Sequence, residues 1–455
     1  MRRNDARGVR AAPNQHSSVP LSDIYDELAQ RPDYERNPVI VVPGILGSQL
    51  TDRSTNEIVW GELYEFGDNH LEQLALPMHA GVPLHRLHDP VVPSGPLDQL
   101  TFKVLGLPIH VNAYAQILAT LGVGGYRDKH FRGRMGLNEV DYGDEHFTCY
   151  QFAYDWRRDV SESAAQLHQF IEQSAATIQE EYASRYGITN QPVRFDIVAH
   201  SMGGLVARYY LRYGNQVLPE DGSLPVLNWA GARRINQLIL VGTPNRGSTQ
   251  ALVELQEGMQ LAKGLPHFPA AVVGTMPAAY QLLPRPQDAQ VLLDGHPVNF
   301  LDPRHWIANG WGLADPKRQR ELQRLLPQSG PHERQQIAQE HLAKCLSMAR
   351  QFHASLDVVA PLPPGTEIHL FAGDAKKTLS ELRYDSNGFH PLEIKTAGDG
   401  TVTRASAASE YKSATGRRQR GIKFDSETFI ESGHVGLTRD RIFVDNVLNR
   451  LLKPK

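Results

Sequence analysis

The stretch Phe195-Asp-Ile-Val-Ala-His-Ser-Met-Gly-Gly204 decides the fold of this chain. An apolar, strand-like run leads straight into Ser201, and an apolar helical pattern starts directly after it. Small residues, Ala199 and Gly203, stand two positions before and after the serine. A strand that turns sharply into a helix needs small residues there, because the two backbones nearly touch. The stretch therefore predicts a nucleophile elbow with the Ser201 hydroxyl exposed at a helix N-terminus.

The surrounding chain alternates between strand and helix patterns. Short apolar runs predict strands at Pro38–Val42, Thr148–Ala153, Val193–Val198, Ile235–Val241 and Glu367–Ala372, and apolar residues at helical spacing predict helices over Leu167–Tyr186, Leu205–Tyr213, Ala251–Leu265 and about Arg439–Leu452. Strand and helix in alternation mean a mostly parallel central sheet and an α/β fold. Asn387-Gly388 predicts a hairpin turn.

The composition limits the classes of function. The chain has 455 residues, enough for about three domains or for one enlarged by insertions. Its 47 basic and 50 acidic residues give a net charge of −3, which provides no field for collecting nucleic acid. The arginine-rich first ten residues are followed by no apolar signal segment, and no run is long enough to cross a membrane. We expect a cytoplasmic protein with two buried, reduced cysteines, Cys149 and Cys345.

A serine hydroxyl becomes a strong nucleophile only when a histidine takes its proton and a carboxylate orients that histidine. Downstream of the elbow, His434 lies on a glycine-flanked loop just before the last predicted helix. Two carboxylates compete for the third role: Asp374 follows a predicted strand, and Asp399 lies between two glycines. We favour Asp399, since a tight glycine loop can project it towards the histidine. His200 is expected to face away from that histidine.

When the serine attacks a carbonyl group, the carbonyl oxygen becomes negative in the transition state, and two backbone N–H donors are needed to stabilise it. Met202 supplies one, as the residue after the nucleophile, and the turn Pro43–Ser48 after the first strand supplies the other, which we assign to Ile45. His79, His85, His88 and Asp89 fit no closed zinc pattern, so we predict no metal and no cofactor.

Five ordered motifs carry a family resemblance: Pro43-Gly-Ile-Leu-Gly-Ser48, Tyr154-Asp-Trp-Arg157, Ala199-His-Ser-Met-Gly203, Gly398-Asp-Gly-Thr-Val402 and Gly433-His-Val435. The chain resembles the lecithin:cholesterol acyltransferase and phospholipid:diacylglycerol acyltransferase family over residues 38 to 440. The resemblance implies an α/β-hydrolase with lid and cap that moves fatty acyl groups of lipids through an acyl-serine. It also implies that Ser201, Asp399 and His434 form the triad, that Ile45 and Met202 form the oxyanion hole, and that Trp60 corresponds to the lid tryptophan.

The sequence differs from the secreted family members at one feature, and several residues have two possible roles. No cysteine lies between Ile45 and Cys149, so the disulfide of the lid loop is missing. Tyr154 and Trp156 belong to a motif that precedes the serine, which favours a structural or pocket-wall role. Pro244, in the motif Gly242–Ser248, lies where α/β sheets place ligands, although a plain turn explains that motif equally well. Tyr154, Trp156, Pro244 and Trp60 are candidate substrate-binding residues.

The resemblance also divides the chain. Residues 1–37 form a polar tail, residues 38–50, 140–245 and 366–455 form the hydrolase core, residues 51–139 form the lid, and residues 246–365 form the cap. We expect a serine hydrolase or O-acyltransferase acting on lipid esters, with apolar contact to a lipid surface through the lid and cap. The alternatives are an esterase, thioesterase or amidase on a soluble substrate, and a lipid- or partner-binding protein without turnover.

Overall fold

The computed structural model describes residues 29–61, 69–97, 99–104, 107–112, 115–128, 146–260, 267–385, 388–392, 395–413 and 415–452. A six-stranded sheet, parallel throughout, runs through its centre. In spatial order its strands are β21 (Ser426–Ile430), β14 (Glu367–Gly373), β9 (Ile235–Val241), β8 (Phe195–His200), β1 (Val39–Val42) and β7 (Cys149–Gln151).

Both faces of this sheet are buried, which explains why its strands are continuous apolar runs. In β1, Val39 and Val41 pack into one hydrophobic cluster, whereas Ile40 and Val42 pack into another, as the alternation of a strand requires. The first face is covered by α2 (Ala115–Val123) and α12 (Arg441–Leu451), and the second by α3 (Val160–Tyr186) and α4 (Met202–Tyr213). The chain therefore has the α/β-hydrolase fold.

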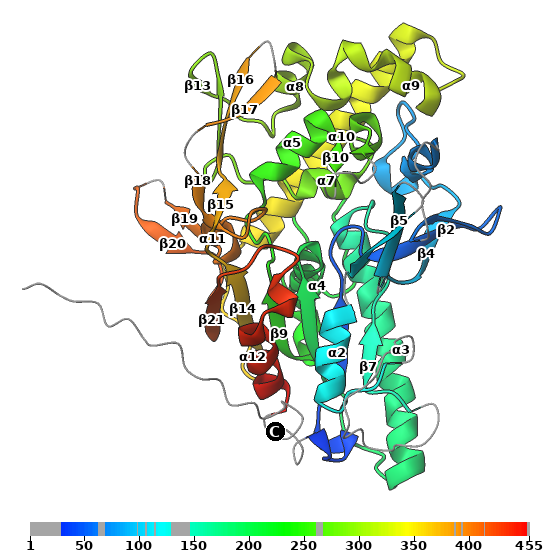
Figure 1. Ribbon diagram of the computed structural model, residues 1–455, viewed down its shortest axis with the longest axis vertical. Helices are drawn as coiled ribbons and strands as arrows, with labels where there is room; N and C mark the ends of the chain where they lie inside the picture. The colour runs from blue at the N-terminus through cyan, green and yellow to red at the C-terminus, as the bar shows by residue number, and fades with distance from the viewer. Residues whose placement is uncertain are drawn as a thin grey trace, which may run out of the picture.

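The helices between β9 and β14 gather beyond the carboxyl ends of the strands, at the upper end of the molecule in Figure 1. They are α5 (Thr249–Glu257), α6 (Ala270–Val273), α7 (Pro277–Gln281), α8 (Pro303–Asn309), α9 (Gln319–Leu325) and α10 (Pro331–Asp357). We refer to this group as the cap helices. The short 3-10 helices of the described residues are η1 (Asp33–Glu35), η2 (Asn69–Leu74), η3 (Leu84–Arg86), η4 (Ala230–Arg233), η5 (Gly312–Ala314), η6 (Pro316–Arg318) and η7 (Leu437–Arg439).

Small sheets surround the central one. Before β7 they are formed by β2 (Ser48–Asp52), β3 (Glu57–Trp60) and β4 (Val91–Pro96), and by β5 (Gln99–Val104) with β6 (Leu107–Asn112). After β9 they contain β10 (Met259–Gln260) with β11 (His267–Phe268); β12 (Gln290–Leu293), β13 (His296–Pro297), β16 (Glu381–Asp385) and β17 (Gly388–Pro391); β15 (Lys376–Leu379) with β18 (Lys395–Gly398); and β19 (Glu410–Lys412) with β20 (Arg418–Arg420). One short helix, α11 (Arg404–Ala407), lies between β18 and β19.

The predicted strands of the central sheet are present with ends shifted by a few residues, and β16 pairs with β17 around the predicted hairpin, whose residue 387 lies outside the described residues. The helix predicted over Ala251–Leu265 was too long. Gly258 ends α5 with a φ of 90°, and a side chain there would meet the Phe268 carbonyl oxygen. The sequence also missed β21, a short edge strand whose residues are mostly half-exposed.

The division into tail, core, lid and cap stays a prediction, as does the cytoplasmic location. In the part of the chain that the structure describes, no helix combines the length and apolarity needed to cross a bilayer.

A buried ion-pair cluster fixes the segment before β1 to α3. His146 lies between two carboxylates, with Nε2 2.7 Å from Asp33 Oδ2 and Nδ1 2.9 Å from Glu181 Oε2. Burial opposes the charged imidazolium, but hydrogen bonds and charge from both carboxylates outweigh burial and raise the pKa of His146 to about 9. The folded protein therefore holds a proton that the unfolded chain releases near pH 6.5.

We predict that this proton stabilises the fold below about pH 6.5 and that its contribution is lost as the pH rises through about 9. Denaturant unfolding of the wild type and His146→Gln, measured from pH 6 to 10, checks this. The free-energy difference between the two proteins is expected to shrink steadily over that range. A difference that stays constant with pH would contradict the assignment.

Candidate active site

Ser201 connects β8 to α4 through a strained turn. Its φ is 52° and its ψ is −127°, a region that non-glycine residues rarely adopt. A Cβ atom on Gly203 would lie 2.3 Å from the Pro43 carbonyl oxygen, and one on Gly204 would lie 2.0 Å from Thr243 Oγ1. The first turn of α4 thus presses against the segments that follow β1 and β9, and no larger residue fits at these two positions.

The imidazole of His434 lies beside this serine. His434 Nε2 is 2.9 Å from Ser201 Oγ, although the two residues are 233 positions apart. The loop between β21 and η7 carries the histidine, and its backbone N–H donates to the Asp399 carbonyl oxygen at 3.0 Å. Gly242 lies under the ring, where a Cβ atom would be 3.2 Å from Nδ1. The absence of a side chain at Gly242 therefore leaves room for the imidazole.

Asp399 completes the hydrogen-bonded chain. Its Oδ2 is 2.7 Å from His434 Nδ1, and its Oδ1 accepts the backbone N–H groups of Thr401 and Val402 at 2.9 and 2.7 Å. Burial acts to raise the pKa of this carboxyl, but the charge of His434 and these hydrogen bonds lower it below its usual value. Asp399 is therefore ionised and favours the tautomer in which Nδ1–H donates and Nε2 accepts from Ser201.

The competing carboxylate lies elsewhere. Asp374 accepts from Arg404 Nη1 at 3.1 Å, and its backbone N–H donates to Ile430. The structure brings Asp399, rather than Asp374, to His434.

The expectation for His200 was wrong. Its ring does not face away from His434, because Nε2 is 3.3 Å from the His434 carbonyl oxygen and the ring centroids are 5.1 Å apart. Burial and, to a smaller extent, the charge of His434 lower the pKa of His200 to about 3. His200 is thus a neutral contact that helps to hold the histidine loop. No sequence pattern indicated this, because it depends on how two distant loops meet.

The turn predicted to supply an oxyanion donor packs against the start of α4. Ile45 is partly exposed and follows Pro43 and Gly44, and Pro43 contacts Gly203 as described above. Met202 is the first residue of α4, where a helix leaves its N–H groups without an intrahelical acceptor. The two predicted donor residues therefore lie on adjoining segments of the chain.

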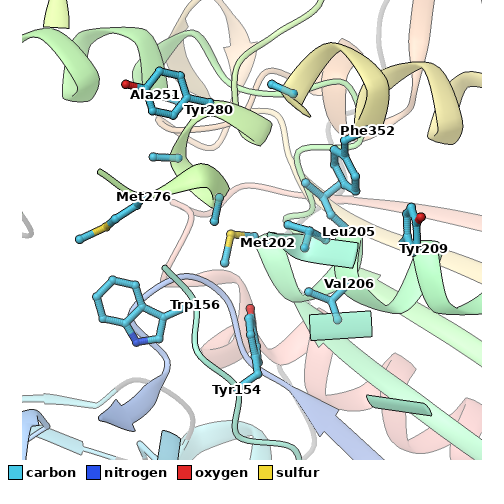
Figure 2. Packing of buried hydrophobic residues seen from close by; sticks show 14 of the residues in the cluster. Tyr154, Trp156, Met202, Leu205, Val206, Tyr209, Ala251, Met276, Tyr280 and Phe352 are labelled. Carbon is cyan, nitrogen blue, oxygen red and sulfur yellow. The ribbon is translucent and has the colours of Figure 1, made fainter. Parts of the chain in front are cut away.

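The three aromatic candidates donate side-chain hydrogen bonds to backbone carbonyl oxygens of this turn. Tyr154 Oη donates to the Pro43 carbonyl oxygen at 2.8 Å, Trp156 Nε1 to that of Ser48 at 3.1 Å, and Trp60 Nε1 to that of Leu46 at 2.8 Å. All three side chains are almost fully buried. Tyr154 and Trp156 belong to the same apolar cluster as Met202 and the cap residue Met276 (Figure 2). Their observed role is structural, and contact with a substrate stays a prediction.

Residues 137–296 match the lecithin:cholesterol acyltransferase family. The resemblance seen in the sequence motifs is confirmed over this segment, and it supports an enzyme of the hydrolase and acyltransferase class that acts on acyl esters of lipids. A search of the curated proteins finds no match.

One solved structure supports the fold. A chain in the crystal structure of the Tle4-Tli4 complex is 16% identical, with a TM-score of 0.56, and the match covers 91% of this chain and 98% of that chain. Lipase 1 from Pelosinus fermentans is 12% identical with a TM-score of 0.35, and the match covers 92% of this chain and 100% of that chain.

Arg157, in the motif Tyr154–Arg157, is buried and pairs with two carboxylates. The Arg157 guanidinium donates to Asp155 Oδ2 at 2.8 Å and to Asp89 Oδ2 at 2.7 Å. Asp89, which the sequence grouped with three histidines, therefore pairs with an arginine. No group of three or more potential metal ligands comes together within the described residues.

Pro244 lies in the buried loop between β9 and α5, and this loop contacts the segment around Asp399. Asn245 Nδ2 donates to the Ala407 carbonyl oxygen at 2.7 Å, and Ser248 Oγ donates to that of Thr401 at 2.5 Å. Because the N–H of Thr401 in turn binds Asp399, this loop supports the acidic member of the hydrogen-bonded chain. The motif was visible in the sequence, but its partners were not.

The cap contributes a carboxyl group near the site. A hydrogen bond with the Gln250 side chain and the charge of His434 both act to lower the pKa of Glu254 in α5. Burial outweighs both effects and raises the pKa of Glu254 to about 7.

A carboxyl group whose pKa is raised on folding costs stability once it ionises, so the cost should grow from about pH 4.5 to pH 7 and then stay constant. We predict that Glu254→Gln matches the wild type in unfolding free energy at pH 4 and exceeds it by about 2 kcal/mol at pH 8. Glu257→Gln, an exposed change on the same helix, is the control and should show no such pH-dependent gain. Equal stabilities of wild type and Glu254→Gln at pH 8 would contradict the prediction.

Proposed function

We infer that the protein is a serine-dependent acyl-ester hydrolase or O-acyltransferase of lipids, resembling a lipase or a phospholipase A. One observation carries this proposal: the continuous chain of hydrogen bonds from Asp399 through His434 to Ser201, with distances of 2.7 and 2.9 Å. The serine of that chain lies on a strained elbow at the start of a helix, which is the arrangement of an activated nucleophile.

In the first half of the reaction, Ser201 Oγ attacks the ester carbonyl carbon while His434 Nε2 takes the hydroxyl proton. Asp399 stabilises the imidazolium that forms and keeps its Nδ1–H pointed at the carboxylate. When the tetrahedral intermediate collapses, the bond from the carbonyl carbon to the leaving oxygen breaks. Nε2–H then protonates that oxygen, so an alcohol departs and an acyl-serine remains.

The negative charge on the intermediate needs donors that are in place before the reaction. The proposal assigns this role to the backbone N–H groups of Met202 and Ile45. Support comes from the way the turn is fixed: Tyr154, Trp156 and Trp60 each donate a hydrogen bond to one of its carbonyl groups. A turn held from behind by three buried aromatic side chains loses little energy to reorganisation during the reaction.

The second half repeats the chemistry with a new nucleophile. Water or an alcohol gives its proton to His434 Nε2 and attacks the acyl carbonyl, and the proton then passes back to Ser201 Oγ as the acyl group leaves. Water makes the enzyme a hydrolase and an alcohol makes it an acyltransferase. A lipid substrate is supported by the family match and by the apolar cluster that runs from the cap to Met202 (Figure 2). Contact with a lipid surface through the lid and cap belongs to the same proposal.

A fluorophosphonate probe is expected to label the wild type and to leave Ser201→Ala unlabelled, because the probe traps only an activated serine. Ser223→Ala, at an exposed surface position, is the control and should be labelled like the wild type. Persistent labelling of Ser201→Ala would exclude Ser201 as the nucleophile. Intact-mass measurement after incubation with a lipid extract then shows the acyl group on the wild type, and soluble esters that acylate faster than lipids would exclude a lipid preference.

Asp399→Asn is expected to lower kcat about ten-thousandfold while the fold is retained, because the amide stabilises the wrong histidine tautomer. Asp374→Asn is the matched control, since that carboxylate pairs with Arg404 and not with His434. Its kcat should stay within a factor of two of the wild type. Hydrolysis of a p-nitrophenyl ester by both variants measures this, and a normal rate for Asp399→Asn would refute the assignment.

A further inference from the structure

A cleft opens beside the segments that flank Asp399 in sequence, and it does not include the Asp399–His434–Ser201 hydrogen bonds. It has a volume of about 580 Å³ and lies between the cap and the core, with walls from the loop after β9, from α11 and from the β19–β20 hairpin. Neither Ser201 nor His434 lines it. Its lining is rich in charge and contains the cations Arg246, Arg404, Lys412 and Arg418 and the acids Asp288, Glu381 and Glu410.

The β19–β20 hairpin places two like charges directly opposite each other. In its antiparallel register Glu410 is opposite Arg420, and Lys412 is opposite Arg418. The first pair is complementary and forms an ion pair of 2.9 Å. The second pair is two cations, an arrangement that costs stability unless an anion lies between them. Within the described residues, neither Lys412 nor Arg418 forms an ion pair.

Arg246 adds a buried cation to the same cleft. Only 3% of it is exposed, its Nε donates to Asp288 Oδ2 at 2.5 Å, and its guanidinium stacks on Tyr411. Its Nη1 lies 3.6 Å from Asp357 Oδ1, beyond hydrogen-bond range. Neither terminal nitrogen of Arg246 donates a hydrogen bond to a described residue, but its stack on Tyr411 places the guanidinium on the face of the hairpin opposite Lys412 and Arg418, so Arg246 lines the cleft without facing that pair.

Two of the three carboxylates in the lining are paired with arginines. Asp288 is engaged by Arg246, and Glu410 by Arg420. Arg404 reaches out of the cleft to Asp374. Glu381 is then the remaining acid of the lining, against the two cations Lys412 and Arg418, which leaves an excess of positive charge.

We propose that this cleft binds a phosphate-type oxyanion between Lys412 and Arg418. An oxyanion accepts charge-assisted hydrogen bonds from several cations at once, which removes the repulsion across the hairpin. The cleft is much larger than a phosphate ion, so it accommodates the organic part of a phosphate ester. The anion is either a soluble phosphate ester or the headgroup of an acidic lipid, and both present the same group to the cleft.

Two probes separate these sources. Glycerol 3-phosphate is titrated into the full-length protein by calorimetry, and the protein is sedimented with phosphatidylcholine vesicles with and without phosphatidic acid. Saturable binding of glycerol 3-phosphate assigns the site to soluble esters, and binding only to vesicles that contain phosphatidic acid assigns it to a headgroup. Ser201→Ala should bind like the wild type, so failure of the proposed reaction and failure of this site are distinguishable.

The decisive variant is Lys412→Gln combined with Arg418→Gln, two exposed changes that leave the fold intact. Affinity for whichever probe binds is expected to fall about tenfold or more, while hydrolysis of a neutral soluble ester stays unchanged. Lys377→Gln with Arg383→Gln removes the same charge from exposed positions that do not line the cleft and should leave affinity unchanged. No binding of either probe by the wild type, or equal affinity in the two double variants, overturns the proposal.

Discussion

The close approach of α4 to the end of β1 is the constraint on which the rest of the site depends. Gly203 leaves no room for a side chain between its own backbone and the Pro43 carbonyl oxygen, so strand, serine and helix can meet only at a sharp turn. That turn forces Ser201 into a positive φ and aims its hydroxyl away from the sheet. The histidine loop, the acid loop and the turn Pro43–Ser48 are then arranged around a point that backbone sterics have fixed.

The neighbouring loops are held by hydrogen bonds from buried side chains rather than by regular secondary structure. Three aromatic side chains support the turn after β1, and Ser248 supports the loop that carries Asp399. Each bond satisfies a carbonyl group that burial would otherwise leave without a partner, a penalty of about 1 to 3 kcal/mol apiece. Rigidity around Ser201 therefore comes from residues that do not touch the serine.

Charge is distributed unevenly despite the small net value of −3. Several buried ions are paired, as in the Asp33–His146–Glu181 cluster and at Arg157. On the surface, the β19–β20 hairpin places two exposed cations, Lys412 and Arg418, opposite each other. A small overall charge therefore coexists with a local excess of cations beside the acid loop, and the composition gave no sign of it.

The sequence by itself determined the parallel sheet, the elbow and the order of serine, acid and histidine, because apolar periodicity and small residues around Ser201 are local properties of the chain. Only the tertiary structure decided between Asp399 and Asp374, turned His200 towards His434, and gave Trp60, Tyr154 and Trp156 a place behind the turn. These outcomes depend on contacts between residues far apart in the chain. Many of these residues lie in loops, which have no periodic pattern from which the contacts could be predicted. Residue type predicts which chemistry is available, whereas packing determines which copies of each residue meet.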